Sequence, residues 1–224
     1  MDASDAYRGI RERVTDLVQG LGPDVAEQRA PACPQWTVRE VVAHLTGVCS
    51  DVLAGNLDGA GTDPWTNRQV SARADASLAD LLAEWNEAGP QIEAALGEHM
   101  PDQLLFDTAT HEHDLRSALD RPGARDGLAI ELGLNFALMA IGTSFVGGSL
   151  PAVTVRSDGG QERPIGDGPP VAVLDASSFD LMRSFSGRRT RDQIASLDWG
   201  GADPAPWLDA FTYGPFTLPS QPFE

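Results

Sequence analysis

Apolar residues recur at helical spacing through the first two thirds of the chain. From Tyr7 to Leu21 they stand three or four positions apart, which predicts a helix that begins near Asp5 and ends near Gly22. The same spacing predicts further helices over residues 37–58, 77–97, 104–119 and 126–146. The last of these is apolar around most of its circumference, so we expect it to be central.

The second of these helices has the clearest predicted start. Thr37 and Glu40 have the spacing of a capping box, and Trp36 stands at the position of a hydrophobic staple before it. By contrast, the stretch rich in Gly, Asp and Pro that leads up to Trp65 predicts a loop.

The pattern changes after the Gly147-Gly148 pair. Strands are expected over residues 152–156 and 171–174, with a turn at 157–160 and short helices over 178–183 and 189–197. A Pro-rich tail from Tyr213 is expected to wrap the surface. We therefore predict an α+β chain, with a helical bundle over residues 1–148 and a small α+β domain over residues 149–224.

The charge balance counts against polyanionic partners. The 224 residues include 16 basic and 33 acidic side chains, which gives a net charge of −17 and a pI near 4.4. Such a field repels phosphate backbones and anionic lipid, so we expect neither a nucleic-acid partner nor a membrane partner. Every basic residue is Arg, which excludes a Schiff-base lysine, a Walker-type phosphate loop and a lysine general base.

The sequence predicts a soluble, cytoplasmic protein. Its two cysteines, Cys33 and Cys49, do not make a disulfide framework, which fits a reducing compartment. The N-terminus is acidic where a signal peptide would be basic. Polar residues interrupt the apolar stretch from Leu134 to Val146, so we expect it to be too short and too polar to span a bilayer.

Three polar side chains have the spacing of a metal site. At about 100° per residue, Asp107 and His111 lie about 40° apart on one face of a helix. If the helix that carries His44 faces them, the three form an N,N,O set, and three protein ligands with one open position are typical of catalytic zinc. Glu112 and His113 point more than about 90° away from this face, so neither is a candidate ligand.

Ordinary structural roles also fit these residues. An Asp and a His four positions apart are typical of a solvated helix surface, and His44 fits a hydrogen-bonded histidine of the core. Asp114 would orient an imidazole or pair with an arginine. Cys49 lies about 140° around its helix from His44 and fits a small buried side chain. The aromatic residues Trp36, Trp65 and Phe106 fit either the lining of a substrate mouth or ordinary roles in core packing or as a loop anchor.

Several segments resemble a known family. Two motifs are similar to those of the mycothiol-dependent maleylpyruvate isomerase-like proteins. The first is W-T-V-R followed by H-L in residues 36–45, and the second is H-x-x-D-x-R-x-x-L-x-x-P-G in residues 111–123. These proteins belong to the DinB-like superfamily. Residues 187–190 and 197–199 resemble the C-terminal module of the same family, so the resemblance covers essentially the whole chain.

The resemblance implies a DinB-like four-helix bundle with a divalent metal, expected to be zinc, at its mouth. The ligands of the family carry over to His44, Asp107 and His111, with Asp107 where the family has Glu. Because Asp is one carbon shorter, the ion would sit closer to that helix or bind the carboxylate through water. The catalytic C-terminal Arg of the family has two candidates here, Arg188 and Arg189, and both also fit surface positions at a helix start.

The implied activity is thiol chemistry. In this family the metal binds the thiol of mycothiol or of another small thiol, and a metal-bound thiol loses its proton near neutral pH. The thiolate attacks a small electrophile and then departs (an isomerase) or stays attached (an S-transferase). Two alternatives remain open: a metal-dependent hydrolase that uses bound water, and a non-catalytic metal- or ligand-binding regulatory protein. The protein is expected to be a monomer or a homodimer.

Overall fold

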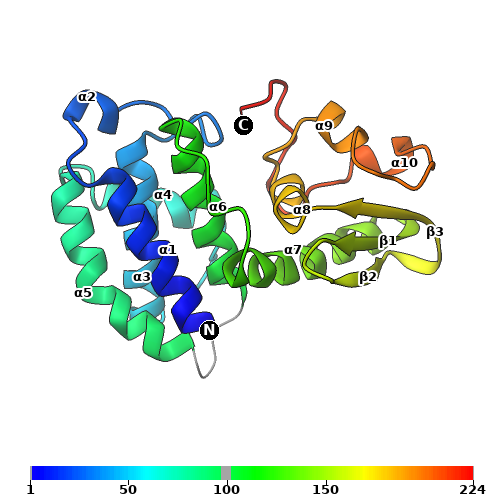
Figure 1. The fold of residues 1–224 in the computed structure, drawn as a ribbon. Coiled ribbons are helices and arrows are strands. Elements are labelled where there is room, and N and C mark those ends of the chain that lie inside the picture. The colour runs from blue at the N-terminus through cyan, green and yellow to red at the C-terminus, as the bar shows by residue number, and fades with distance from the viewer. Residues whose placement is uncertain (1, 97–101, 224) are drawn as a thin grey trace. The chain divides into compact units, whose positions relative to one another are not determined.

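The fold consists of two compact units. The structure is a computed structural model that describes residues 2–96 and 102–223. The chain divides into the units Met1–Gly123 and Ala124–Glu224. In its described residues the first unit is helical, and the second contains a three-stranded sheet (Figure 1). The predicted α+β class is confirmed.

The first unit is built around four long helices. Its elements are α1 (Ala3–Val18), α2 (Pro23–Ala26), α3 (Val38–Ala54), α4 (Asp63–Ser71), α5 (Leu78–Leu96) and α6 (Asp102–Ala118). Helix α1 packs against α5 and α6, and α3 packs against α4, α5 and α6, so α1, α3, α5 and α6 form a bundle (Figure 1). The predicted closure of α5 at Gly97 lies outside the described residues.

The start of α3 follows from its sequence. The hydroxyl of Thr37 accepts a bond from the backbone N–H of Glu40 at 3.2 Å, and the Glu40 carboxylate accepts one from the backbone N–H of Thr37 at 2.8 Å. This is the predicted capping box, which pairs two N–H groups that a helix start would otherwise leave free. The helix ends at Gly55, which takes a left-handed conformation with φ of 69°.

Helix α4 was not predicted. The stretch before Trp65 was expected to be a loop, but Asp63 and Pro64 open a helix whose last turns lie against α3. Proline is favoured in the first helical turn because its missing N–H is not needed there. Gly47 in the middle of α3 lets the two helices come close, since a Cβ at this position would lie 2.8 Å from Cγ of Gln69.

The buried interior of the first unit carries polar atoms that are paired with one another. The hydroxyl of Tyr7 lies 2.8 Å from Sγ of Cys49 and accepts a hydrogen bond from the indole N–H of Trp85 at 2.9 Å. Burial raises the pKa of the Cys49 thiol to about 11. Cys49 is therefore a small buried side chain that stays protonated at neutral pH, in line with its expected role.

The second unit contains a sheet, one long helix and several short helices. Its elements are α7 (Leu128–Gly147), β1 (Pro151–Ser157), β2 (Glu162–Ile165), β3 (Asp167–Ala176), α8 (Ser178–Phe185), α9 (Arg191–Ala195) and α10 (Ala205–Leu208). The strand order is β2-β1-β3, with β1 antiparallel to β2 and parallel to β3. Strand β2 was not predicted, because three of its four residues are exposed and one is proline, so it shows no alternating apolar pattern.

Helix α7 covers nearly the range that the sequence predicted for it. It groups with the second unit, where it packs against α8 and β2, and the predicted domain boundary at residue 148 stays a prediction. Its side chains are not buried all round, since Met139 is 58% exposed. At 20 residues, α7 is longer than the apolar stretch Leu134–Val146, which was expected to be too short and too polar to span a bilayer. It is long and apolar enough to cross a membrane, a test that core helices of soluble proteins also pass.

Candidate functional site

The structure brings His44, Asp107 and His111 together inside the first unit. His44 comes from α3, and the other two come from consecutive turns of α6. Nε2 of His44 lies 3.5 Å from Oδ2 of Asp107, and Nε2 of His111 lies 3.6 Å from Oδ1 of the same carboxylate. One donor atom from each side chain lies within 4.8 Å of the others. Two nitrogens and one carboxylate oxygen therefore converge on one point.

A chain of hydrogen bonds orients His44. Its Nδ1 lies 2.7 Å from Oε1 of Gln69, and Nε2 of Gln69 donates to Oδ2 of Asp51 at 2.7 Å. Because the Gln69 amide donates to Asp51, its oxygen is left to accept the proton from Nδ1 of His44. The lone pair of the imidazole is then on Nε2, the nitrogen that faces Asp107.

Asp114 lies behind His111 in a similar way. Oδ2 of Asp114 is 3.0 Å from Nδ1 of His111, close enough for a bond, although the N–H direction is not well aligned with the oxygen. Asp114 is fully buried. Burial lowers the pKa of His111, and the nearby Asp114 and Asp107 carboxylates oppose that effect only in part. His111 is therefore a neutral imidazole at neutral pH, which is the form that binds metals.

One side of the cluster is closed and the other is open. The ring of Trp36 lies 4.9 Å from the His44 ring and 5.7 Å from the His111 ring, and Trp36 itself is buried. The side chain of Asp107, in contrast, is 31% exposed. A ligand would therefore approach from the side of the carboxylate, while the indole keeps water away from the imidazoles.

Cys33 lies at the back of the site, where no role was predicted for it. Its thiol donates to Oδ2 of Asp114 at 3.8 Å, and both are buried. Donor atoms of Cys33, Asp114 and His111 also lie within 4.8 Å of one another. The thiol thus contacts the carboxylate that faces Nδ1 of His111, on the ring edge away from Asp107.

Glu112 faces away from the cluster, as its helical position predicted. Its carboxylate accepts bonds from Arg13 at 2.8 and 2.7 Å and from Arg116 at 3.0 and 2.9 Å, and its side chain is 1% exposed. These bonds tie α1 to α6. His113 is also buried and is absent from the groups of donors near the site.

Arg188 and Arg189 lie in the second unit and are both buried, so neither is a surface arginine. Arg188 donates to the backbone oxygen of Ser186 at 2.7 Å and places its guanidinium 5.1 Å from the centre of the Phe216 ring. Arg189 pairs with Asp180 at 3.0 Å. Their catalytic role stays a prediction.

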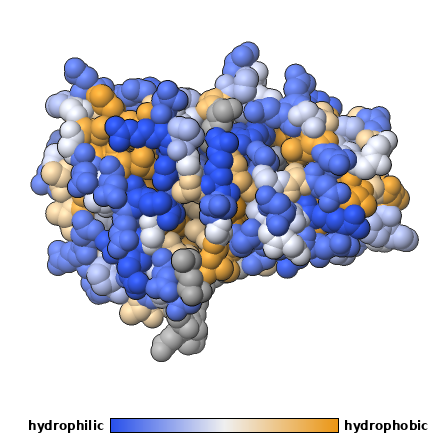
Figure 2. Space-filling view, in the orientation of Figure 1, coloured by the Kyte–Doolittle hydropathy of each residue, from blue (hydrophilic) through white to orange (hydrophobic). Residues whose placement is uncertain are grey.

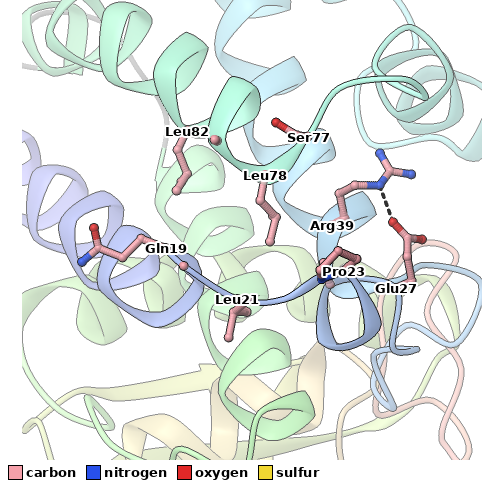
Figure 3. Close-up of a pocket in the computed structure, with 11 residues that line it drawn as sticks. Gln19, Leu21, Pro23, Glu27, Arg39, Ser77, Leu78 and Leu82 are labelled. Carbon is pink, nitrogen blue, oxygen red and sulfur yellow. Dashed lines mark hydrogen bonds and ion pairs between the residues drawn. The ribbon is translucent and has the colours of Figure 1, made fainter.

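The first unit also has a pocket that contains none of the predicted site residues. It measures about 410 Å³ and lies between the end of α1, α2, α3 and the start of α5 (Figure 3). Its lining is largely apolar, and Arg39, the one cation among its described residues, pairs with Glu27 at 2.7 Å. Figure 2 shows a hydrophobic patch on the surface near the α1–α2 end of this unit, on a face that is otherwise mostly hydrophilic.

Sequence reasoning missed Gln69 and Asp51. Asp51 stands seven residues after His44, which is two helical turns and about 20° around α3, so its position on the same face was predictable from spacing. Gln69 comes from the unpredicted helix α4 and had no local signal. Its place beside His44 depends on the packing of α4 against α3.

Comparisons with known proteins agree with the fold. A family model described as the mycothiol maleylpyruvate isomerase N-terminal domain matches residues 7–121. A crystal structure of a histidine-to-alanine mutant of mycothiol-dependent maleylpyruvate isomerase has a TM-score of 0.54 and 11% identity, over 82% of this chain and 87% of that chain. A second structure of such an isomerase has a TM-score of 0.51 and 12% identity, over 83% and 88%. No curated protein matches.

Proposed function

Because the chain belongs to the mycothiol maleylpyruvate isomerase family, we propose that it is a metal-dependent enzyme in which a small thiol attacks an electrophilic substrate. The thiol is mycothiol or another low-molecular-weight thiol, and the reaction is an isomerisation or an S-transfer. The family supplies the thiol dependence. The arrangement of His44, Asp107 and His111 supports the dependence on a metal.

The separation of the donor atoms carries the metal assignment. Ligands about 2.1 Å from a tetrahedral zinc ion stand about 3.4 Å apart. In the structure, Nε2 of His44 lies 3.5 Å from Oδ2 of Asp107, and Nε2 of His111 lies 3.6 Å from the other oxygen, Oδ1, of the same carboxylate. Asp107 therefore reaches the imidazoles in spite of being shorter than the Glu of the family, and the residues fit a divalent cation. When bound, the cation would act as a Lewis acid and lower the pKa of a coordinated thiol.

The surrounding residues prepare the site for this role. Gln69 keeps the lone pair of His44 on the nitrogen that faces Asp107, and Trp36 covers the imidazoles. His111 is neutral because burial lowers its pKa. The open position next to Asp107 is where the thiol and the electrophile would meet.

A thiol from outside the chain is needed as the nucleophile. The pKa of Cys49 is raised to about 11, so almost none of it is thiolate at neutral pH. Cys33 is buried behind His111, on the side away from the exposed carboxylate. Both thiols would persist in the reducing cytoplasm, which is the compartment we propose.

The test is an assay with a generic electrophile, with and without mycothiol, on wild-type protein and on His111→Ala. We expect thiol-dependent turnover that His111→Ala abolishes. Cleavage of a substrate without any thiol would instead indicate a hydrolase. Tight metal binding with no turnover of either kind would indicate a regulatory protein, and each of these two results would overturn the proposed activity.

A further inference from the structure

Asp51 lies on the same face of α3 as His44 but too far along the helix to touch it. The two residues are seven positions apart, which is two helical turns and about 10 Å along the axis. Gln69 of α4 spans this gap, since its side-chain amide contacts Nδ1 of His44 at one end and Oδ2 of Asp51 at the other, each at 2.7 Å. Gln69 and His44 are both buried, so water does not compete for the bond between them.

The amide of Gln69 has two possible orientations, and they place the proton of His44 differently. With its oxygen toward His44, the amide accepts the proton of Nδ1, and the lone pair of the imidazole is on Nε2. With its NH2 group toward His44, the amide donates to Nδ1, and the imidazole proton must be on Nε2, which faces Oδ2 of Asp107 at 3.5 Å. Only the first orientation leaves the Nε2 lone pair available to a cation.

Asp51 decides between these two orientations. A carboxylate has only acceptor atoms, so the end of the amide that faces Asp51 must be its NH2 group. In the opposite orientation, two acceptor oxygens would face each other across the 2.7 Å that now separates Nε2 of Gln69 from Oδ2 of Asp51. They would repel each other, and no hydrogen bond would form. The oxygen of the amide is therefore directed at His44.

The chain beyond α3 holds Asp51 in place. Gly55 takes a left-handed conformation, with φ of 69°, and the turn lets the backbone N–H of Asn56 donate to the backbone oxygen of Asp51 at 2.8 Å. Nδ2 of Asn56 donates to Oδ1 of Asp51, also at 2.8 Å. Each carboxylate oxygen of Asp51 thus accepts a bond from one amide, and Oδ2 is the oxygen that faces Gln69.

We propose that Asp51 is a positioning residue for the metal site, which acts through Gln69 to keep the lone pair of His44 on Nε2. The proposal rests on the proposed function, because it takes His44 to be a metal ligand. Without Asp51, the amide of Gln69 can turn over, and the imidazole of His44 can then donate a hydrogen bond to Asp107 in place of binding a cation. Loss of a partner behind a ligand typically lowers metal affinity by about 10–100-fold.

Variants at residues 51 and 69 test this role. Asp51→Leu removes both acceptor oxygens, and we expect it to weaken zinc binding at least about tenfold in titration against a chromophoric chelator. In the double variant Asp51→Leu/Gln69→Glu, the new carboxylate can only accept, so it holds the proton on Nδ1 of His44 without help from residue 51. The double variant should therefore regain most of the lost affinity. Unchanged affinity in Asp51→Leu, or equal weakness of both variants, would overturn the proposal.

Charge and folding have their own controls. The double variant has the same net charge as wild type, because it loses one acidic residue and gains another. Asp58 is exposed and lies in the loop after α3, so Asp58→Leu removes one negative charge while leaving Asp51 in place, and it should bind zinc as tightly as wild type. Equal losses in Asp58→Leu and Asp51→Leu would count against Asp51. Circular dichroism checks folding, and Asp51→Ala, with a smaller side chain, should weaken zinc binding as Asp51→Leu does.

The tautomer of His44 can also be measured without any metal. Nitrogen NMR of the labelled metal-free protein, above the pH at which the imidazole is protonated, distinguishes a proton on Nδ1 from one on Nε2. We expect Nδ1–H in wild type and in the double variant, and a shift toward Nε2–H in Asp51→Leu. The same tautomer in all three proteins would refute the role of Asp51, whatever the activity. The expected shift in a protein that binds no zinc would support that role toward His44 and refute the metal-dependent activity.

Discussion

Substitution of Gly47 by alanine should lower the stability of the folded protein, although replacing a helical glycine by alanine usually raises stability. In the interior of a helix, alanine is favoured over glycine by about 1 kcal/mol. Here the new Cβ would lie 2.8 Å from Cγ of Gln69, even closer to its Cβ, and 3.0 Å from Nη1 of Arg73. Helix α4 must move outward, which costs about 1–3 kcal/mol.

The same movement would separate Gln69 from His44. Loss of this 2.7 Å bond leaves a buried imidazole N–H without its acceptor, at a cost of about 1–3 kcal/mol. We therefore expect Gly47→Ala to lower the free energy of unfolding by at least about 1 kcal/mol, after subtraction of the helix gain. It should also lower the metal affinity by about 10–100-fold, the typical effect of losing a partner behind a ligand.

The assays are urea denaturation of the metal-free protein and titration against a chromophoric chelator. Gly142→Ala is the control, because it lies inside α7 and its Cβ would meet only Cγ2 of Ile165 at an ordinary 3.8 Å. The control should be as stable as wild type or up to about 1 kcal/mol more stable. If Gly47→Ala and wild type have equal stability and equal metal affinity, the idea that the absence of a Cβ at Gly47 allows Gln69 to reach His44 is refuted.

Two further predictions concern the bundle. Glu112→Ala leaves Arg13 and Arg116 without their shared carboxylate, and urea denaturation should show a free energy of unfolding lower by about 2–3 kcal/mol. The loss should be smaller than for a wholly buried ion pair, because the Arg13 side chain is 38% exposed. An unchanged free energy of unfolding would mean that these ion pairs contribute nothing to stability. Burial raises the pKa of Cys49 from 9.0 to about 11, and the pKa of Tyr7 also rises. Because the folded state holds these protons more tightly than the unfolded state, their contribution to the free energy of unfolding is fully present below pH 9. For the thiol, this contribution falls by about 2–3 kcal/mol as the pH approaches 11. Denaturation at pH 8 to 10.5 should show this decline, and Cys49→Ser should reduce it; an equal decline in both proteins would contradict the assignment to the thiol.

The long helices, and the shared face of Asp107 and His111, followed from the sequence because they depend on local periodicity. The apolar spacing of the bundle helices, and the capping box at Thr37, involve residues within a few positions of one another. Asp107 and His111 share a face of α6 for the same reason. His44 lies on another helix, and its convergence with them was expected only because its motif resembles that of a family.

The remaining features depend on packing that no local pattern encodes. Gln69 reaches His44 because Gly47 leaves room for α4, and neither residue had a signal of its own. Cys33 reaches Asp114 from a loop. The apolar circumference of α7 does not specify which neighbours bury it, and the structure places the helix with the sheet of the second unit.

The most direct test of the account is elemental analysis of the purified protein and of His44→Ala, His111→Ala and His113→Gln. Wild type should contain one divalent metal ion per chain, His44→Ala and His111→Ala should lose it, and His113→Gln should keep it, since His113 is not one of the converging donors. Circular dichroism checks that each variant is folded. Full metal content in both His44→Ala and His111→Ala would contradict the proposed site and the activity assigned to it.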